Sequence, residues 1–366
     1  MADAIPDRVL RFLDSAGSSE PFDPLALEVF AYQLAENAAY RAWCDALGVS
    51  PASVTSVAAI PAVPVAAFKE LELVCGTPAA EFRTSGTTGT GRGRHLLPDL
   101  EPYRISALTH FGRCLLPEGW KLRTLALVPP PDLRPHSSLS RMAAWIMETF
   151  GEPGSGWFIG ADGLERDRLA EALLDAQRGG VPVLILATSA ALIAFLDYAD
   201  VSALRVALTG GSRLMDTGGQ KGARLAAPVP ADAFQESLYR RVAGTLGIPP
   251  DRCVNEYGMT ELTSQAYDRT LADPHGTLDV PRVKLPPPWL SVSAVDPVTL
   301  EAVPPGQSGL LRFVDLANVG SVIAVQTEDF GRLTDGGFIL EGRPRAAEAR
   351  GCGLTFEALQ SMMAAP

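Results

Sequence analysis

The spacing of hydrophobic residues changes twice along the chain, and each change marks a region with a different predicted structure. Through the first eighty residues, apolar side chains recur at helical spacing, most clearly from Leu25 to Leu47, and Pro- and Ala-rich connections follow. This spacing predicts a helical N-terminal cap over residues 1–80.

Between residues 81 and 280, short continuous apolar runs alternate with amphipathic stretches. The predicted strands are 122–128, 156–159, 183–187, 204–208 and 253–255, and the predicted helices are 138–150, 164–178, 234–246 and one that begins near Thr188. Apolar runs of this kind are typical of parallel strands that helices cover on both faces. We therefore expect an α/β core with a parallel sheet.

After residue 280 the helical spacing stops. The apolar segments 289–295, 309–314, 319–326 and 337–341 are separated by Asp-Pro, Pro-Pro-Gly and Asp-Gly-Gly turns. This pattern indicates a small antiparallel β subdomain over residues 281–345. Residues 346–366 are expected to form a short C-terminal tail.

Composition and charge narrow the class of protein. A chain of 366 residues with 47% hydrophobic and 20% charged residues is neither disordered nor a coiled coil. Its net charge of −11 argues against a nucleic-acid partner. No apolar stretch approaches the ~20 residues that cross a bilayer, and the N-terminus has no long apolar run, so we expect a cytoplasmic protein without a membrane partner.

Cysteine and lysine are both scarce. The five cysteines lack C-x-x-C spacing, which argues against a disulfide framework and a structural zinc site. The chain has only four lysines, which are therefore the candidates for any lysine-dependent step: Lys69, Lys121, Lys221 and Lys284.

The strongest chemical signal is the segment Thr84-Ser85-Gly86-Thr87-Thr88-Gly89, which Arg92 and Arg94 follow. Its glycines let successive backbone N–H groups converge on an anion, its hydroxyls add donors, and the arginines add positive charge. It is not a Walker A loop, because Arg92 and Gly93 stand where Lys and Ser/Thr are required. The segment therefore predicts a phosphate-binding loop of another kind.

Three further motifs lie at or near predicted strands. Residues 255–261 read Asn-Glu-Tyr-Gly-Met-Thr-Glu and lie at the carboxyl end of a predicted strand, where open α/β sheets bind their ligands. A Thr-Gly-Gly-Ser turn at 209–212 follows the predicted strand 204–208. The segment 327–331 reads Thr-Glu-Asp-Phe-Gly, and Gly342-Arg343 comes after it.

These four elements, in this order, resemble the adenylate-forming superfamily of acyl-CoA synthetases, luciferases and peptide-synthetase adenylation domains. The resemblance covers roughly residues 82–343 and is most similar in detail to LuxE-like acyl-protein synthetases, followed by phenylacetate–CoA ligases. The segments that carry this detail are 65–69, 137–139, Gly210-Gly211 with Lys221, and 350–352. The resemblance implies the large N-terminal domain of that fold, a parallel α/β core with a small antiparallel subdomain.

The resemblance also implies ATP and Mg²⁺ as cofactors. It implies nucleotide contacts for Thr84, Ser85, Gly86, Thr87, Thr88, Gly89, Gly210, Gly211, Ser212, Tyr257, Gly258, Met259, Thr260, Asp329 and Arg343. The loop residues 85–89 would hold the β- and γ-phosphates. Gly210, Gly211 and Ser212 would line the adenine, on which Tyr257 would stack.

The remaining implied roles concern the reacting end of the nucleotide. Thr260 would contact the α-phosphate, Glu261 would hold Mg²⁺, Asp329 would bind the ribose hydroxyls, and Arg343 would lie at the ribose or α-phosphate. The implied reaction is attack of a carboxylate on the α-phosphorus with release of pyrophosphate, for which the protein supplies positioning and charge neutralisation.

The chain departs from the family pattern after the Gly-Arg motif. Typical members continue into a lid domain that brings a catalytic lysine, whereas 23 residues follow Arg343 here and none is lysine. We therefore expect the C-terminal lid domain to be absent. Either adenylation uses a substitute cation, for which Lys221 is the catalytic candidate, or the protein performs only part of the reaction cycle.

Cys352, between Gly351 and Gly353, is the candidate acyl acceptor, because LuxE-like enzymes pass the acyl group to a cysteine of their own. Arg350 would favour the thiolate that this transfer needs. The alternative for Cys352 is a small buried residue in the last turn.

The substrate is expected to be a fatty or aromatic acid, with His136 near its carboxylate. An acceptor protein such as a reductase or a carrier would take the acyl group. The alternatives are ligation to CoA, release of the adenylate to another enzyme, or a nucleotide-binding regulator without turnover. The presence of Glu261, Asp329 and Arg343 together argues against the regulator.

Overall fold

The structure is a computed structural model, and it describes residues 4–84, 91–218, 231–273 and 281–343. Its contacts form two compact units. The first unit is drawn from Met1–Thr109, Met259–Gln265 and Pro286–Pro366, and the second from His110–Gly258 and Ala266–Leu285. Each unit thus combines segments from more than one of the expected regions.

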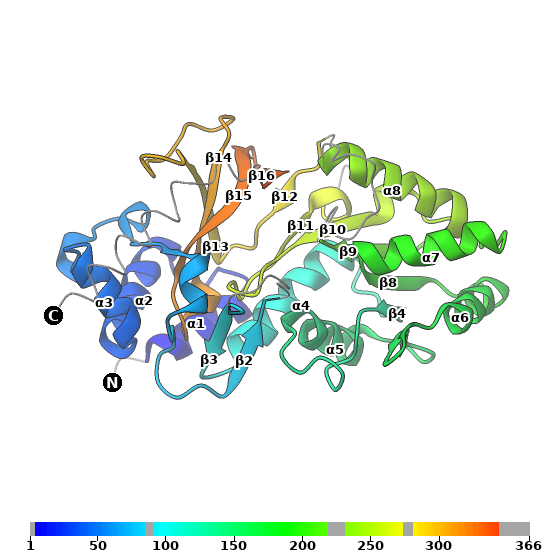
Figure 1. Cartoon of the computed structure of the whole chain (residues 1–366), viewed down its shortest axis with the longest axis horizontal. Helices are drawn as coiled ribbons and strands as arrows, with labels where there is room; N and C mark the ends of the chain where they lie inside the picture. The colour runs from blue at the N-terminus through cyan, green and yellow to red at the C-terminus, as the bar shows by residue number, and fades with distance from the viewer. Residues whose placement is uncertain (1–3, 85–90, 219–230, 274–280, 344–366) are drawn as a thin grey trace. The chain divides into compact units, whose positions relative to one another are not determined.

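The second unit contains the parallel sheet that the apolar runs predict (Figure 1). Its parallel strands lie in the order β5-β4-β8-β9-β10, and β11 and β12 continue the sheet in antiparallel pairing. The strands are β4 (Arg123–Leu127), β5 (Gly156–Trp157), β8 (Val183–Thr188), β9 (Arg213–Thr217), β10 (Cys253–Tyr257), β11 (Ala266–Asp268) and β12 (Lys284–Leu285); β6 (Ile159–Gly160) and β7 (Gly163–Leu164) form a separate hairpin.

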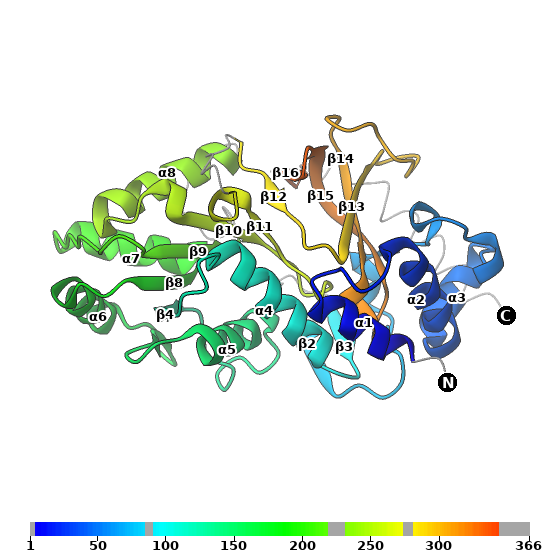
Figure 2. The same cartoon turned by 180° about the vertical axis from the view of Figure 1, so that it is seen from behind.

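Helices cover both faces of this sheet. They are α5 (Ser138–Phe150), α6 (Arg166–Gly179), α7 (Ser189–Val201) and α8 (Ala231–Leu246), and α4 (Glu101–Leu115) is divided between the two units. Figure 2 shows α6, α7 and α8 beside the strands. Apolar residues of these helices form one core with alternate residues of the strands. On the other face, Phe111 contacts Phe150 and Tyr267, and the Tyr267 hydroxyl lies 3.9 Å from the Met142 sulfur.

Side-chain caps explain why two helices begin where the sequence predicts. The Ser137 hydroxyl accepts from the Ser140 N–H at 3.1 Å, and the Thr188 hydroxyl accepts from the Ala191 N–H at 3.2 Å. Each cap satisfies one of the N–H groups that a helix N-terminus leaves without an intrahelical partner.

The predicted strand 204–208 is wrong. The segment is extended, but its Val206 and Leu208 N–H groups donate to the Thr245 and Leu246 carbonyls at the end of α8, at 2.8 and 3.1 Å. The last carbonyls of a helix need such partners, so helix α8 rather than the sheet pairs with this segment. The strand that joins the sheet here is β9, which begins at Arg213.

The first unit combines helices with an antiparallel sheet in the order β13-β14-β15-β16, and β1 pairs with β15 in parallel. Its helices are α1 (Ile5–Asp14), α2 (Phe22–Glu36) and α3 (Ala38–Ala46), and its strands are β1 (Val63–Pro64), β2 (Ala80–Arg83), β3 (Arg94–Leu97), β13 (Leu290–Val295), β14 (Gly309–Asp315), β15 (Ala324–Thr334) and β16 (Gly337–Gly342). Short 3₁₀ turns over the chain are η1 (Pro51–Ser53), η2 (Val57–Ala59), η3 (Val65–Lys69), η4 (Pro250–Arg252), η5 (Arg269–Leu271) and η6 (Leu316–Asn318).

The predicted strand 319–326 is correct only in its second part. The side chain of Gln33 in α2 is fully buried and donates to the Asn318 and Val319 carbonyls at 2.9 and 3.1 Å, and its carbonyl oxygen accepts from the Ile323 N–H at 2.8 Å. These bonds hold a turn, so β15 begins at Ala324.

Among the helices of the described residues, none has both the length and the apolar character that a membrane span requires.

Candidate active site

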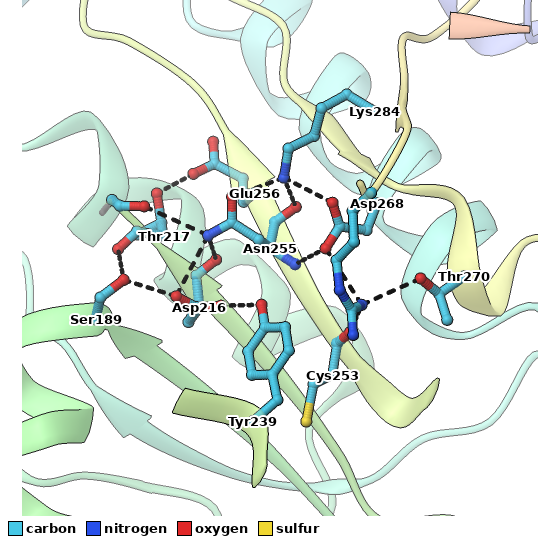
Figure 3. Close-up of polar contacts among 12 residues, drawn as sticks. Ser189, Asp216, Thr217, Tyr239, Cys253, Asn255, Glu256, Asp268, Thr270 and Lys284 are labelled. Carbon is cyan, nitrogen blue, oxygen red and sulfur yellow. Dashed lines mark hydrogen bonds and ion pairs between the residues drawn. The ribbon is translucent and has the colours of Figure 1, made fainter. Parts of the chain in front are cut away.

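The carboxyl ends of the parallel strands in the second unit carry buried polar side chains (Figure 3). The register aligns the last residues of β8 and β9 with Glu256 of β10, so these strand ends share one edge of the sheet. There Asp216 accepts from the Ser189 hydroxyl at 2.6 Å and from the Tyr239 hydroxyl at 2.5 Å, and burial raises its pKa. Open α/β sheets bind ligands at this edge.

Lys284 is committed to this network. Its ammonium group donates to the Asn255 backbone carbonyl at 2.9 Å, to the Asn255 side-chain oxygen at 2.6 Å and to Asp268 at 2.8 Å. Three donors therefore meet three acceptors around Asn255, as Figure 3 shows. Lys284 thus fixes β10 to its neighbours, and its protons are not available to a phosphate.

Glu256 and Tyr257 close β10 at the same edge. Glu256 is 6% exposed and accepts from the Thr217 hydroxyl, and burial raises the pKa of its carboxyl group to about 7. Tyr257 is 7% exposed. The edge is the one that the 255–261 motif predicts.

The turn at 209–212 does not lie at this edge, so the predicted position of Gly210, Gly211 and Ser212 at the carboxyl end of a strand is wrong. The turn precedes β9, and the Ser212 hydroxyl accepts from the N–H of Val183, the first residue of β8, at 3.1 Å. A Cβ on Gly211 would lie 3.1 Å from the Trp120 ring. The turn therefore packs at the amino end of the sheet.

The residue that follows β9 at its carboxyl end is Gly218, which has a φ of +96° that favours glycine. Sequence reasoning missed it, although a signal was present. The tripeptide Thr-Gly-Gly occurs twice, at 209–211 and at 217–219, and only the second copy follows a strand of the sheet.

The phosphate-loop residues Ser85 to Gly89 lie outside the described residues, but both ends of the loop are described. These flanking residues adjoin the hairpin that β2 and β3 form in the first unit. The Thr84 N–H donates to the Gly93 carbonyl at 3.0 Å, and the Gly93 N–H donates to the Thr84 hydroxyl at 3.0 Å. Thr84 and Gly93 are therefore paired with each other on either side of the loop, and we call this pair the neck of the loop.

Glu261 lies beside this neck. It is 7% exposed, and a Cβ on Gly93 would lie 3.5 Å from its Oε1 atom. Burial raises the pKa of the Glu261 carboxyl group to about 7; Arg343 opposes the shift, and Asp329 and Glu328 add to it. A buried acid in this position is well suited to a cation that balances its charge.

Asp329 and Arg343 meet through strand pairing. Phe330 of β15 is opposite Gly342 of the antiparallel strand β16, so Asp329, which precedes Phe330, is a neighbour of Arg343, which follows Gly342. The Arg343 guanidinium donates to Asp329 at 2.7 Å and lies 3.5 Å from Glu328. The structure thus brings Glu261, Asp329 and Arg343 of the predicted site together in the first unit.

The donor set at Glu261 fits Mg²⁺. Among the described residues, no three side chains of His, Cys, Asp or Glu form a ready metal cage. Mg²⁺ in nucleotide-binding enzymes is usually held by one or two carboxylates together with substrate phosphates. One buried carboxylate beside the neck of the predicted phosphate loop matches that arrangement.

The backbone around Glu261 is held by buried side chains, because residues 259–265 belong to no helix or strand. Asp315 accepts from the Thr263 N–H at 3.0 Å and from the Ser264 hydroxyl at 2.7 Å. Burial raises the pKa of Asp315 to about 6. Together with Asn318, which donates to the Glu261 carbonyl at 3.1 Å, these bonds define the path of the segment.

The other candidate residues are placed as follows. Thr260 and Met259 are half-buried, and Gly258 is exposed. His136 is exposed and precedes the cap of α5, in the connection that leaves the carboxyl end of β4. Lys69 and Lys121 are exposed, whereas Lys221 and Cys352 lie outside the described residues.

The four described cysteines are poor nucleophiles. Cys44, Cys75, Cys114 and Cys253 are buried, and burial raises the pKa of each thiol. Because the thiolate is the reactive form, none of these four is suited to accept an acyl group.

Comparison with known proteins concerns the family and the fold of the chain. Residues 204–360 match the family described as acyl-protein synthetase, LuxE. No curated protein matches the chain in sequence.

Solved structures give the fold. The crystal structure of 2-hydroxyisobutyryl-CoA ligase with 2-HIB-AMP is 17% identical, with a TM-score of 0.64, over 88% of this chain and 67% of that one. ATP-bound MatB from Rhodopseudomonas palustris is also 17% identical, with a TM-score of 0.50, over 73% of this chain and 48% of that one. In fold, and in the sequence of residues 204–360, the chain is similar to adenylate-forming ligases, which supports an enzyme of the ligase class.

Proposed function

We propose that the protein activates a carboxylic acid with ATP, forming an acyl adenylate and pyrophosphate. The observation that carries this proposal is the position of Glu261. Its buried carboxylate lies beside Gly93 at the neck of the phosphate loop, and Arg343 and Asp329 are close enough to influence its charge. A site with these groups suits a nucleotide bound with a divalent cation.

In this proposal, the loop at 84–89 binds the β- and γ-phosphates through backbone N–H groups and hydroxyls, and Asp329 accepts from the ribose. Glu261 would hold Mg²⁺, which when bound neutralises charge on the phosphates. The substrate carboxylate forms a bond to the α-phosphorus as the bond to the bridging oxygen breaks, and that electron pair leaves with pyrophosphate. Arg343 and Lys221 are proposed to neutralise charge at the α-phosphate.

The acceptor is proposed to be a thiol. Cys352 falls within the segment that matches the LuxE acyl-protein synthetases, and the four described cysteines are buried. Attack of the Cys352 thiolate on the acyl carbon would release AMP and leave a thioester, from which a partner protein takes the acyl group. CoA is the alternative acceptor, since 2-hydroxyisobutyryl-CoA ligase has been crystallised with its adenylate and CoA.

The substrate is proposed to be a fatty or aromatic acid, with His136 near its carboxylate. Exchange of labelled pyrophosphate into ATP tests the proposal directly. A panel of fatty and aromatic acids, with and without CoA, should contain at least one acid that supports Mg²⁺-dependent exchange. ATP binding without exchange for any acid would instead favour a nucleotide-binding regulator.

A further inference from the structure

His95 is a buried residue of the first unit to which the proposed reaction assigns no role. It lies in β3, two residues after Gly93, and is 1% exposed. Its Nδ1 atom lies 2.7 Å from the Thr260 backbone carbonyl and its Nε2 atom 2.9 Å from the Asn318 side-chain oxygen. The ring packs edge to face against Phe68. Both nitrogens of this histidine are therefore directed at polar partners.

The partners of Asn318 show that both ring nitrogens of His95 lie opposite hydrogen-bond acceptors. The Asn318 amide nitrogen donates to the Glu261 carbonyl at 3.1 Å and to the Val322 carbonyl at 2.9 Å, which fixes the orientation of the amide. Its oxygen also accepts from the Thr263 hydroxyl at 2.7 Å. Asn318 therefore binds the Glu261 carbonyl, and His95 lies against the carbonyl of the preceding residue, Thr260.

The same end of β3 also faces the Glu261 side chain. Residues two apart in an extended chain point to one face, so Gly93 and His95 share a face. Gly93 is next to the Glu261 carboxylate, and His95 contacts the backbone immediately before it. One short segment thus meets the acidic residue on both its side chain and its backbone.

We infer that His95 is a positioning residue that latches the Thr260–Glu261 backbone to the phosphate-loop hairpin and so directs the Glu261 carboxylate toward the neck of that loop. The latch itself concerns the backbone of the free protein; its consequence for Mg²⁺ rests on the proposed function. A connection between the loop and the carboxylate would keep the two in register when the nucleotide binds.

Hydrogen exchange in the free protein tests the latch without any substrate. In His95→Ala, the backbone amides of residues 259–265 should exchange at least several-fold faster than in the wild type. His110→Ala is the matched control, because His110 is also 1% exposed and its Nε2 atom lies 3.0 Å from the Leu285 carbonyl in the second unit. Unchanged exchange of 259–265 in His95→Ala, or equal acceleration in His110→Ala, would overturn the inference.

Two conservative variants locate the contact and cover the case in which alanine prevents folding. An asparagine amide reaches roughly the position of Nδ1, and a glutamine amide roughly that of Nε2. A neutral histidine has one N–H, so it donates to one of its two acceptors. His95→Asn or His95→Gln should therefore restore slow exchange in 259–265, and failure of both would contradict a latch made by hydrogen bonding.

The consequence for the metal is measured by calorimetry of ATP binding at increasing Mg²⁺. Loss of a residue that orients a metal ligand typically lowers metal affinity about 10- to 100-fold. His95→Ala should raise the half-saturating Mg²⁺ concentration by about tenfold or more, and His110→Ala should not. Wild-type protein that binds no Mg²⁺-ATP would contradict the proposed function, while the exchange comparison would still decide the latch.

Discussion

At the scale of single residues, Gly93 has little room for a side chain. An added Cβ would lie 3.0 Å from the Thr84 methyl group and 3.5 Å from Glu261 Oε1. We expect Gly93→Ala to lower adenylation about ten- to a hundredfold, because displacing the loop neck and the carboxylate disturbs the reacting geometry. Pyrophosphate exchange at saturating acid measures the effect.

Gly210→Ala is the control for that variant. A Cβ there would meet nothing within 4 Å, and the turn precedes β9 at the amino end of the sheet. ATP affinity and exchange should stay within about twofold of the wild type, as for a surface change away from a site. A large loss of ATP affinity in Gly210→Ala would return this turn to the nucleotide site.

Glu261→Gln separates binding from chemistry. The amide keeps the size of the side chain but removes the negative charge that would hold Mg²⁺. We expect ATP affinity to be largely retained and Mg²⁺-dependent exchange to fall about 10²- to 10³-fold. Exchange at the wild-type rate would show that another group holds the metal.

Cys352→Ser tests the acceptor. Incubation with ATP and a labelled acid should leave hydroxylamine-sensitive label on the wild-type protein, because hydroxylamine cleaves thioesters. The serine variant should carry none while it still exchanges pyrophosphate. Label that persists in Cys352→Ser would move the acceptor to another residue, and exchange without label in the wild type would favour CoA or free adenylate.

At the scale of elements, the end of β14 supports the segment around Glu261 through Asp315. Because burial raises its pKa from 3.8 to about 6, the folded state binds more protons than the unfolded state between these values. The stabilising contribution of Asp315 is therefore fully present below about pH 3.8 and is lost as the pH rises toward 6. The shift corresponds to about 3 kcal/mol.

Asp315→Asn should remove this dependence. We expect the variant to be less stable than the wild type, since an amide leaves one of the donors from Thr263, Ser264 or Ala317 without an acceptor. The deficit should shrink as the pH is raised from 4 to 6.5, measured by urea unfolding. A deficit that stays constant or grows over this range would contradict the assigned shift.

The sequence predicts elements well where one local rule decides them. The helix 138–150 matches α5, whose beginning Ser137 caps, and the buried runs at 122–128 and 183–187 correspond to β4 and β8. Segment 204–208 has a strand-like apolar pattern too, but its N–H groups pair with the end of α8. Which element supplies the partner is a tertiary property that the local pattern does not contain.

The candidate site residues also divide into those that local sequence predicts and those that depend on tertiary contacts. The motifs at 255–261 and 327–331 could be assigned because they lie next to strand ends, and the pairing of β15 with β16 brings Asp329 and Arg343 together. The sequence pattern places the Gly210 turn at a strand end only because it also predicts a strand at 204–208. His95 could not be found, because a single histidine in a short strand has no pattern that points to a partner 165 residues away.

At the scale of the whole molecule, the net charge of −11 opposes an anionic nucleotide. Binding must therefore come from local groups, and the first unit supplies the loop neck, Arg343 and the buried acid that a divalent cation would neutralise. The motif around β10 is divided, since Gly258 ends a segment of the second unit and Met259 begins one of the first.

The central claim is that an acyl adenylate forms. Its most direct test is a single-turnover reaction with enzyme in excess over labelled ATP, quenched in acid and analysed by mass spectrometry for each acid of the panel. The account predicts acyl-AMP, and pyrophosphate in an amount equal to acyl-AMP plus the AMP that transfer to a thiol releases, only when Mg²⁺ and a suitable acid are present. Intact ATP with every acid, or cleavage to ADP and phosphate, would contradict it.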